Sequence, residues 1–493
     1  MVQIQYMHQR LAQFCYNERA GRTTRKKGSE QSVKIAFYTL GCKVNQYETQ
    51  ALREQFQQRG YQVVGDEDHA DVYVINTCTV TGLSDRKSRQ YIRRVKRINP
   101  ESVTAVIGCY AQVSPGEALA IEGVDIVAGN NDKAYLIQHV EEYLRTGSKS
   151  SHVTRYEDLN TYEDTGAITS MDTRTRAYLK IQEGCNQFCS YCIIPYARGG
   201  VRSRKLSKIL EEARQLIDHG VRELVLTGIN VALYGTEPEY AMDPEEQNAL
   251  VEACRAAGKG NRESIKGIEV VICALNALPG SFRIRLSSLE PTVINADYAE
   301  GLLAYDRLCH SMHLSLQHGS DRILADMNRH YRQADYLELV QRLRKHDPGY
   351  GISTDLIVGY PGETQEDFDE TLKVVKAVGF CKSHVFKYSR RVGTKAAERK
   401  DQIHPDVKSQ RSTTLQEIAG QAASEFFHQQ LGTLRTVLLE ERKEETGLCE
   451  GFTDNYIKVT CPGGPELVHQ FVQVRLTEVK EEGMIGIIDH PSC

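Results

Sequence analysis

The 493-residue sequence predicts an α/β fold class arranged in three successive folded domains. Short apolar strands alternate with amphipathic helices over residues 33–145, as in βαβ units with a parallel sheet. The alternation resumes over residues 175–425 with six strand candidates, which favours a partial (βα)6 barrel over a closed eightfold barrel. Residues 428–490 carry short strands between turn residues, which indicates a small all-β barrel.

In the first domain, apolar runs and helical periodicity define the expected elements. We expect strands at 34–40, 71–77, 104–108 and 124–129, and helices at 45–60 and 84–98. Gly60 stands where a helix commonly ends in a left-handed residue. Because helices separate the strands, the strands are expected to be parallel, with their carboxyl ends at one edge of the sheet.

The two later domains show the same kinds of pattern. The six strands expected in the central domain lie at 177–182, 222–227, 282–287, 312–317, 352–359 and 384–389. The five short strands expected in the terminal barrel lie at 434–441, 447–455, 456–461, 470–479 and 484–489. The connection 236–281 is unusually long; its start predicts a surface insertion and its tail, 267–280, a helix.

The segments outside these domains are polar. Residues 1–32 predict a polar extension without the apolar region of a secretory signal, and residues 146–174 predict a linker. No apolar run approaches the roughly 20 residues that span a bilayer, so no membrane partner is expected. We therefore expect a cytoplasmic protein, and in that reducing compartment clustered cysteines favour metal binding or catalysis over disulfides.

Three cysteines share one short loop, with the spacing Cys185-x3-Cys189-x2-Cys192. Three thiolates can hold three irons of a [4Fe–4S] cube and leave the fourth iron open to another ligand. The loop follows a strand of the expected barrel, at the end where α/β barrels place their active sites. The alternatives are buried structural cysteines or a structural zinc site. Structural zinc needs four ligands, and the sequence places no fourth Cys or His nearby.

Three further cysteines, Cys42, Cys78 and Cys109, each stand just after a strand of the first domain. Since neighbouring parallel strands end at one edge, these thiols are expected to converge and to hold a second [4Fe–4S] cluster. The alternative for each is a small buried core residue. The remaining cysteines show no ligand spacing and predict packing or surface positions.

The net charge of −4 excludes a protein covered in basic residues, although three local basic runs occur. These runs are residues 86–97, 198–208 and 387–395. Each run is either a solvated face or a surface that binds nucleic acid phosphates.

The segments LGCKVNQYET, INTCTVT, IGCYAQ and GCNQFCSYCIIPYARG carry a specific resemblance. Together with a terminal β-barrel, they resemble the radical S-adenosylmethionine (SAM) methylthiotransferase family over residues 34 to about 490. Within that family they are most similar to the branch that modifies N6-threonylcarbamoyladenosine in tRNA. The resemblance implies a flavodoxin-like first domain, a partial radical-SAM barrel, and a terminal OB-like barrel of the TRAM type, which binds RNA.

The resemblance also implies the activity, which is radical methylthiolation of C2 of that adenosine at position 37, beside the anticodon. The implied cofactors are two [4Fe–4S] clusters and SAM, which serves as methyl donor and radical source. The implied partners are the tRNA anticodon stem-loop, an electron donor of flavodoxin or ferredoxin type, and a sulfur source. By analogy the SAM contacts are expected at Thr227, Gly228, Asn230, Ser287, Gln317 and Gly359.

Two aromatic residues and three histidines carry further expectations. Phe452 and Tyr456 of the terminal barrel are expected to be exposed and to stack on loop bases. His313, His318 and His384 are expected to be structural groups rather than bases. The alternatives in function are the isopentenyladenosine branch of the family, a single-cluster radical-SAM enzyme acting on a small molecule, and a non-catalytic RNA-binding protein with structural zinc.

Overall fold

A computed structural model describes residues 32–169, 171, 175–258 and 265–489. The chain divides into two compact units. The first contains the chain up to Ile168 with Gly184–Asn186 and Cys192–Gly200, and the second contains Thr169–Glu183, Gln187–Tyr191 and Val201 onward. The expected extension 1–32 and the cysteines at positions 15 and 493 lie outside the described residues, except for Ser32.

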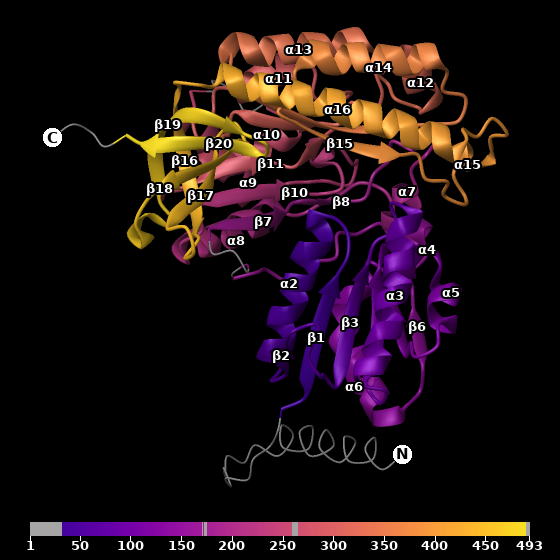
Figure 1. The fold of residues 1–493 in the computed structure, drawn as a ribbon. Helices are drawn as coiled ribbons and strands as arrows, with labels where there is room; N and C mark the ends of the chain where they lie inside the picture. Colours follow the sequence, from indigo (N-terminus) through magenta and orange to yellow (C-terminus); the bar gives the residue numbers. More distant parts are fainter. Residues whose placement is uncertain (1–31, 170, 172–174, 259–264, 490–493) are drawn as a thin grey trace. The chain divides into compact units, whose positions relative to one another are not determined.

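The first unit is built on a six-stranded sheet with the order β2-β1-β3-β4-β5-β6, in which every pair is parallel (Figure 1). Its strands are β1 (Lys34–Thr39), β2 (Gln62–Val64), β3 (Val72–Thr77), β4 (Val103–Gly108), β5 (Ile126–Ala128) and β6 (Ser150–His152). Its longer helices are α2 (Lys43–Gln58), α3 (Gly82–Ile98) and α6 (Leu136–Thr146), with the short α4 (Cys109–Val113) and α5 (Pro115–Ala120).

Both faces of this sheet are buried, as in other parallel sheets with helices on each side. Val74 and Ile107 belong to one core cluster, while Ile75 and Val106 belong to a second. The alternation of side chains along β3 and β4 therefore feeds two cores. The four expected strands and both expected helices are present, and Gly60 follows α2 with φ +96°, as predicted.

The sheet has two strands more than the sequence predicts. The three-residue β6 pairs with β5 and lies within the expected linker 146–174, which is therefore not wholly irregular. Its sequence, Ser-Ser-His, has no apolar alternation, so periodicity cannot reveal it. The strand β2 also has only three residues, which are too few to show a period.

The second unit contains parallel strands in two adjoining sheets, β11-β10-β7 and β12-β13-β14-β15. Ser287 alone separates β11 from β12, so these two form one interrupted strand. The strands are β7 (Arg176–Lys180), β10 (Glu223–Thr227), β11 (Arg283–Leu286), β12 (Ser288–Leu289), β13 (Ser311–Leu314), β14 (Gly351–Val358) and β15 (Lys382–Lys387). Each of the six expected strands is present, with bounds shifted by a few residues.

Helices separate these strands, as the periodicity predicts. They include α8 (Leu206–Asp218), α11 (Ala296–Leu302), α12 (Asp321–Asp326), α13 (Gln333–His346), α14 (Gln365–Val378), α15 (Lys395–Glu398) and α16 (Pro405–Gln429). The connection 236–281 holds α9 (Pro244–Ala256), which begins at an Asp243 capping box, and α10 (Ile268–Asn276), which is the expected helix. Among the described residues, no helix combines the length and apolar character needed to cross a bilayer.

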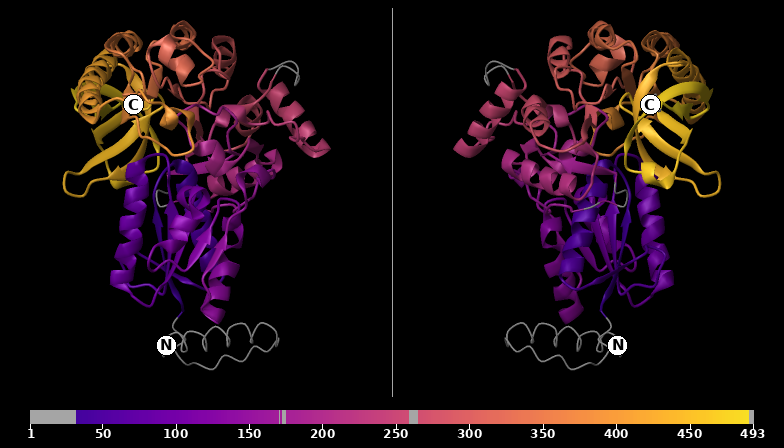
Figure 2. Two further views of the ribbon diagram at one scale, coloured as in Figure 1. Left: turned by 90° about the vertical axis from the view of Figure 1, so that its right-hand side faces the viewer. Right: turned by 90° about the vertical axis from the view of Figure 1, so that its left-hand side faces the viewer.

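The chain ends in a closed five-stranded barrel with the order β16-β17-β18-β20-β19. Its strands are β16 (Leu434–Arg442), β17 (Leu448–Thr453), β18 (Lys458–Pro462), β19 (Phe471–Lys480) and β20 (Gly483–Ile488). Cys449 and Cys461 are fully buried in its core, which confirms their expected packing role. Phe426 and Phe427 at the end of α16 join this core, so the gold helix α16 lies beside the yellow barrel (Figure 2).

A buried charge network joins the terminal barrel to the starts of the parallel strands. Glu223 is fully buried and accepts hydrogen bonds from Arg283 at 2.6 Å and Arg285 at 2.9 Å. Arg285 also donates to the backbone carbonyl oxygens of Thr453 and Asp454, at 3.0 and 3.1 Å. The arginines hold the pKa of Glu223 far below its usual range although burial opposes this. The turn after β17 is therefore fixed to the amino-terminal ends of β10 and β11.

Candidate metal centres and cofactor site

Cys42, Cys78 and Cys109 follow β1, β3 and β4, the neighbouring strands in the middle of the first sheet. Cys42 is the residue before α2, and Cys109 begins α4. Burial raises the pKa of Cys78 to about 12, and the charges of Cys109 and Cys42 contribute to this rise. The structure therefore brings the three thiols to one edge of the sheet, where the topology predicts them.

Two glycines allow these loops to approach one another. Gly41 has φ +113°, and a Cβ atom at this position would lie 2.8 Å from Cys78 Cβ and 3.2 Å from Cys78 Sγ. Gly108 has φ +96°, and a Cβ there would lie 2.6 Å from the Thr77 carbonyl oxygen. Any other residue would force the loops apart and would adopt a strained backbone conformation.

Asn45 and Asn130 hold the loops around the thiols. Asn45 Nδ2 donates to the carbonyl oxygens of Leu40 at 2.8 Å and Thr77 at 3.0 Å, which links the loops after β1 and β3. Asn130 Nδ2 lies 3.9 Å from Cys109 Sγ and donates to the Ala197 carbonyl at 2.6 Å. The edge that carries the three cysteines is thus fixed by buried amides.

The spacing of these thiols bears on the kind of metal that fits. Among the described residues, two groups of three ligand atoms lie within 4.8 Å of one another, and neither includes a cysteine. Sulfurs bound to one tetrahedral zinc at about 2.3 Å would be only about 3.8 Å apart. At least two of the three sulfurs are therefore farther apart than in a zinc site, as suits a larger, multi-iron centre.

The loop of Cys185, Cys189 and Cys192 follows β8 (Gln182–Glu183) and precedes α7 (Ile194–Arg198). All three cysteines are half-buried, so a bound group could reach them. Cys189 Sγ accepts a hydrogen bond from Arg329 Nη1 at 3.3 Å. Arg329 in turn pairs with the buried Glu290 at 2.6 Å, which keeps this buried cation neutralised.

Gly184, just before the first of these cysteines, shapes the loop. It has φ +73°, and a Cβ atom there would lie 1.8 Å from the Gly200 carbonyl oxygen. The backbone N–H of Cys185 donates to the Gly199 carbonyl at 3.0 Å. The two glycines at 199 and 200 therefore close the loop against its own start.

Four of the expected SAM contacts lie at the carboxyl ends of β10 and β11. Thr227 is the last residue of β10, and Gly228 and Asn230 follow it. Gln182 Oε1 accepts hydrogen bonds from the backbone N–H groups of Ile229 and Asn230, at 3.0 and 2.9 Å. Asn230 Oδ1 and Ser287 Oγ are buried and have no hydrogen-bond partner among the described residues. Such orphaned buried atoms are where a polar ligand would bind.

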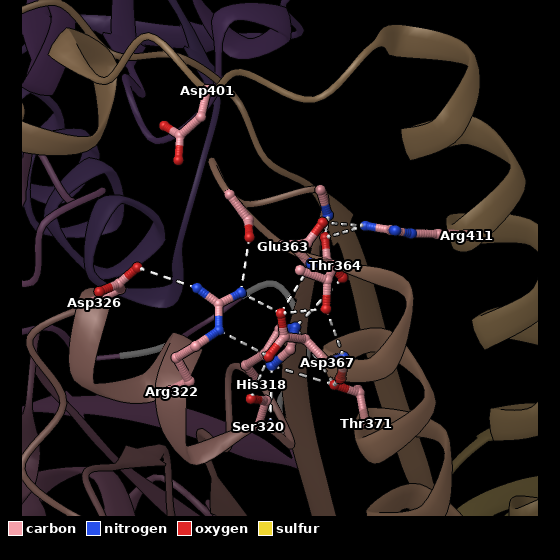
Figure 3. Close-up of polar contacts among 12 residues, drawn as sticks. His318, Ser320, Arg322, Asp326, Glu363, Thr364, Asp367, Thr371, Asp401 and Arg411 are labelled. Atoms are coloured by element: carbon pink, nitrogen blue, oxygen red, sulfur yellow. Dashed lines mark hydrogen bonds and ion pairs between the residues drawn. The ribbon is translucent and has the colours of Figure 1, made fainter.

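Gln317 and Gly359, the other expected contacts, lie beside and after β14. Gln317 has φ +65°; its N–H donates to the Asp355 carbonyl at 2.9 Å, and its carbonyl accepts from Ile357 N–H at 2.8 Å. Gly359 has φ +71°, and its N–H donates to the carboxylate of buried Glu363. Glu363 also pairs with Arg411 at 3.2 Å and His318 at 3.3 Å (Figure 3).

A second layer of polar contacts supports the same loop (Figure 3). Ser320 Oγ donates to Asp367 Oδ1 at 2.7 Å, and Arg322 Nη2 donates to the Gly362 carbonyl at 2.7 Å. His318 is fully buried between Glu363 and Thr371, as expected for a structural group. Side chains of α12, α14 and α16 therefore hold the loop after β14 in place.

The sequence does not reveal that Asp355 lies between two of the histidines. His313 Nε2 lies 3.2 Å from Asp355 Oδ2, and His384 Cα pairs with Asp355 Cα in the β14–β15 register. His313 Nδ1 is 3.1 Å from Ser353 Oγ. Asp355 and the two histidines stand on three different strands, far apart in the sequence. No short motif in the sequence therefore indicates that they meet.

Two expectations about surface exposure are wrong. In the run 198–208, Arg198, Arg202 and Arg204 are only 0%, 3% and 2% exposed, so they do not form a surface patch. Phe452 and Tyr456 are half-buried, because the guanidinium groups of Arg176 and Arg285 each lie 4.8 Å from one of these rings. Arg198 and Arg204 are buried in ion pairs with Glu48 and Glu212. The two rings are covered by arginines of β7 and β11, which are distant in the sequence.

The run 387–395, in contrast, lies at the surface. Lys387, Arg390 and Lys395 are exposed, and Val392 between them is 91% exposed. Exposed basic residues also occur along α3, at Arg86, Lys87, Arg93, Arg94 and Arg97. These two surfaces therefore have the exposed positive charge that binding of nucleic acid phosphates requires.

Known protein families match both the domain with Cys42, Cys78 and Cys109 and the domain with the CxxxCxxC loop. Residues 34–129 match the uncharacterized protein family UPF0004, and residues 179–375 match the radical SAM superfamily. The chain is 39% identical to the threonylcarbamoyladenosine tRNA methylthiotransferase MtaB of Bacillus subtilis, over 90% of this chain and 93% of that protein. It is 37% identical to the MtaB protein of Aquifex aeolicus, over 88% and 98% of the two chains.

More distant relatives complete the comparison. The tRNA-2-methylthio-N(6)-dimethylallyladenosine synthase of Finegoldia magna is 31% identical, over 93% of this chain and 95% of its own. Among solved structures, the radical SAM methyltransferase TsrM of Kitasatospora setae matches with a TM-score of 0.51 and 15% identity, over 74% of each chain, which supports the fold alone. With its three strand-end cysteines and its CxxxCxxC loop, the chain belongs to the radical-SAM methylthiotransferase family.

Proposed function

We propose that this chain transfers a methylthio group to C2 of N6-threonylcarbamoyladenosine at position 37 of tRNA, beside the anticodon. The observation that carries this proposal is the convergence of Cys42, Cys78 and Cys109 at one sheet edge. A single-cluster radical-SAM enzyme has no need of a second trio of thiols, and a zinc protein would need them closer together. The identity of 39% to a relative with this substrate in its name supports the choice of base.

The donor sets suit two [4Fe–4S] clusters and SAM. Cys42, Cys78 and Cys109 would hold one cluster, and Cys185, Cys189 and Cys192 the other, each with one iron free of protein ligands. When bound, the clusters and SAM supply the radical and the methylthio group, because a C2–H bond has no acidity that side chains could use. The fit for SAM rests on Asn230 Oδ1 and Ser287 Oγ, which are buried and have no hydrogen-bond partner in the part of the chain that the structure describes.

The chain's own residues bind and orient these groups. Asn230 Oδ1 is an acceptor suited to an amino or hydroxyl group, and Ser287 Oγ can donate to a carboxylate. Gln182 fixes the backbone of the Asn230 loop, and Glu363 fixes the loop at Gly359. Thr227, Gly228 and Gln317 line the same strand ends. These contacts hold SAM at the carboxyl edge, where parallel strands bind ligands.

We assign RNA binding to the second unit and to the basic surfaces. The domain limits proposed are 33–145 for a flavodoxin-like domain, 175–425 for the partial radical-SAM barrel and 428–490 for an OB-like TRAM barrel. The exposed run 387–395 would contact phosphates of the anticodon stem-loop, whose single-stranded loop leaves the base accessible. A flavodoxin- or ferredoxin-type electron donor and a sulfur source would serve the enzyme in a reducing compartment such as the cytoplasm.

Mass spectrometry of tRNA nucleosides tests the proposal, using cells with the gene, without it, and with variants restored. Loss of the 2-methylthio derivative of threonylcarbamoyladenosine is expected without the gene and with Cys42→Ala/Cys78→Ala/Cys109→Ala. Cys254→Ala, which removes a buried thiol from α9, is the matched control and should restore the nucleoside. Loss of the isopentenyladenosine derivative instead would assign the chain to the sister branch. No change in either nucleoside would overturn the proposal.

A further inference from the structure

Arg198, the last residue of α7, is fully buried beside the thiols of the first unit. Its Nε donates to Cys109 Sγ at 3.3 Å. Its Nη1 donates to Glu48 Oε1 at 2.8 Å, and its Nη2 donates to Asn45 Oδ1 at 2.5 Å. The guanidinium therefore uses each of its three nitrogens, and one of them is directed at a proposed cluster ligand.

Arg198 shares its carboxylate partner with a second buried cation. Lys133 is also fully buried, and it pairs with the same carboxylate of Glu48. Two buried cations thus share one buried anion, Glu48, which is 1% exposed. Negative charge close to buried cations stabilises them. Cys109 Sγ is in contact with the guanidinium and can supply that charge, as a thiolate bound to iron.

The second trio has a comparable contact with a buried arginine. Cys189 of the second trio also accepts a hydrogen bond from a buried arginine, Arg329, at the same 3.3 Å. Arg329, however, has its own carboxylate partner, Glu290, at 2.6 Å. At the Cys109 site, by comparison, two buried cations contact the one carboxylate of Glu48.

We propose that Arg198 is a positioning residue that sets the reduction potential of the cluster held by Cys42, Cys78 and Cys109. This inference rests on the proposed function. An N–H···S bond and a nearby positive charge both stabilise the more negative, reduced form of an iron–sulfur cluster. Glu48 opposes this effect, and Asn45 orients the guanidinium. Because Arg198 lies six residues after Cys192, one segment serves both the second trio and the support of the first cluster.

The test uses the full chain with Cys185, Cys189 and Cys192 replaced by Ala, so that only the first cluster assembles. Reconstituted protein is titrated with one-electron mediators while the cluster is followed by electron paramagnetic resonance, and iron is counted. Arg198→Gln is expected to disfavour the reduced form at least tenfold, a shift of about 59 mV to more negative potential for one electron. Glu48→Gln is expected to shift the potential in the opposite direction.

Two further variants separate the role of Arg198 from simple packing. Arg198→Lys keeps the charge and should return the potential toward that of the parent. Arg204→Gln removes an equally buried arginine that pairs with Glu212, and should leave the potential unchanged. If Arg198→Gln holds no iron while Arg204→Gln holds the parent amount, the positioning role is supported as well.

Three results would overturn the inference. The potential could be the same in Arg198→Gln as in the parent, or Arg198→Gln and Glu48→Gln could shift it in the same direction. Either result, with a cluster present, leaves the proposed function intact and removes the role of Arg198. If the parent itself assembles no cluster at Cys42, Cys78 and Cys109, the proposed function fails together with this inference.

Discussion

Arg329 Nη1 lies 3.3 Å from Cys189 Sγ, although the two residues are 140 positions apart in the sequence. The arginine is held by Glu290 at 2.6 Å and by the Ser315 carbonyl at 3.1 Å. Both charged side chains are less than 10% exposed. This buried pair ties the CxxxCxxC loop to the strand ends at β12 and β13.

Removing one partner of this pair should be costly. Arg329→Gln leaves Glu290 buried without its cation, and we expect the free energy of unfolding to fall by about 3–5 kcal/mol. Urea unfolding followed by circular dichroism measures the change. The double variant Glu290→Gln/Arg329→Gln should recover part of this stability, because it removes both charges. An unfolding midpoint for Arg329→Gln equal to that of the wild type would contradict the importance of the pair.

Gly184 should be essential for the second metal site. Gly184→Ala places a Cβ atom 1.8 Å from the Gly200 carbonyl oxygen, on a backbone with φ +73°. We expect iron in the reconstituted protein to fall from about eight to about four atoms per chain, because only one cubane remains. Gly200→Ala is the matched control, since a Cβ there meets no atom within 4 Å. Equal iron contents in the two variants would show that the loop tolerates the clash.

The contact between His310 and Asp347 predicts a pH-dependent stability. The hydrogen bond from His310 Nδ1 to Asp347, at 2.8 Å, raises the pKa of His310 although burial opposes this. Asp347 is also bound by Arg435 of β16 at 3.0 Å, so the group helps to hold the terminal barrel. Because the folded pKa lies above the unfolded pKa, the stabilisation is complete below about pH 6.5 and disappears as pH rises through the folded value.

Thermal unfolding of the wild type and His310→Gln, compared between about pH 5.5 and pH 9, measures this effect. The difference in Tm should be largest at acid pH and should shrink as the pH rises. His428→Gln, which removes an exposed imidazole from α16, is the control and should show no such trend. A difference that stays constant or grows with pH would contradict the assignment.

The exposed run 387–395 should contribute to tRNA affinity. Arg390→Glu/Lys395→Glu replaces two exposed cations with anions, so binding should weaken. The salt dependence of log Kd should fall by about one for each phosphate that the variant no longer neutralises. Filter binding of an anticodon stem-loop at several salt concentrations measures both quantities. Lys208→Glu reverses an exposed charge on α8 and is the control. Unchanged affinity and salt slope in the double variant would exclude this surface.

The sequence predicts the fold well where periodicity and topology determine it. The strands after which Cys42, Cys78 and Cys109 stand are long apolar runs, and the rule that parallel strands end together places the thiols without further information. The expected SAM contacts Asn230 and Ser287 likewise follow strands, and the structure leaves their polar atoms buried and unpartnered among the described residues.

Features built from contacts between distant segments could not be predicted. Arg198 belongs to a basic run in the sequence, and only the packing of α7 against α4 makes it a buried partner of Cys109. Phe452 and Tyr456 have the composition of a base-stacking surface, but Arg176 of β7 lies over the ring of Phe452 and Arg285 of β11 lies over the ring of Tyr456. Strand β6 has no apolar pattern that would predict it. Its pairing with β5 places it at the edge of the sheet.

Iron and acid-labile sulfide counted per chain after anaerobic reconstitution are the most direct measure of two separate cubane sites. The wild type should hold about eight irons, and either Cys42→Ala/Cys78→Ala/Cys109→Ala or Cys185→Ala/Cys189→Ala/Cys192→Ala should hold about four. About four irons in the wild type, unchanged when Cys42, Cys78 and Cys109 are replaced, would show that the first trio binds no cluster.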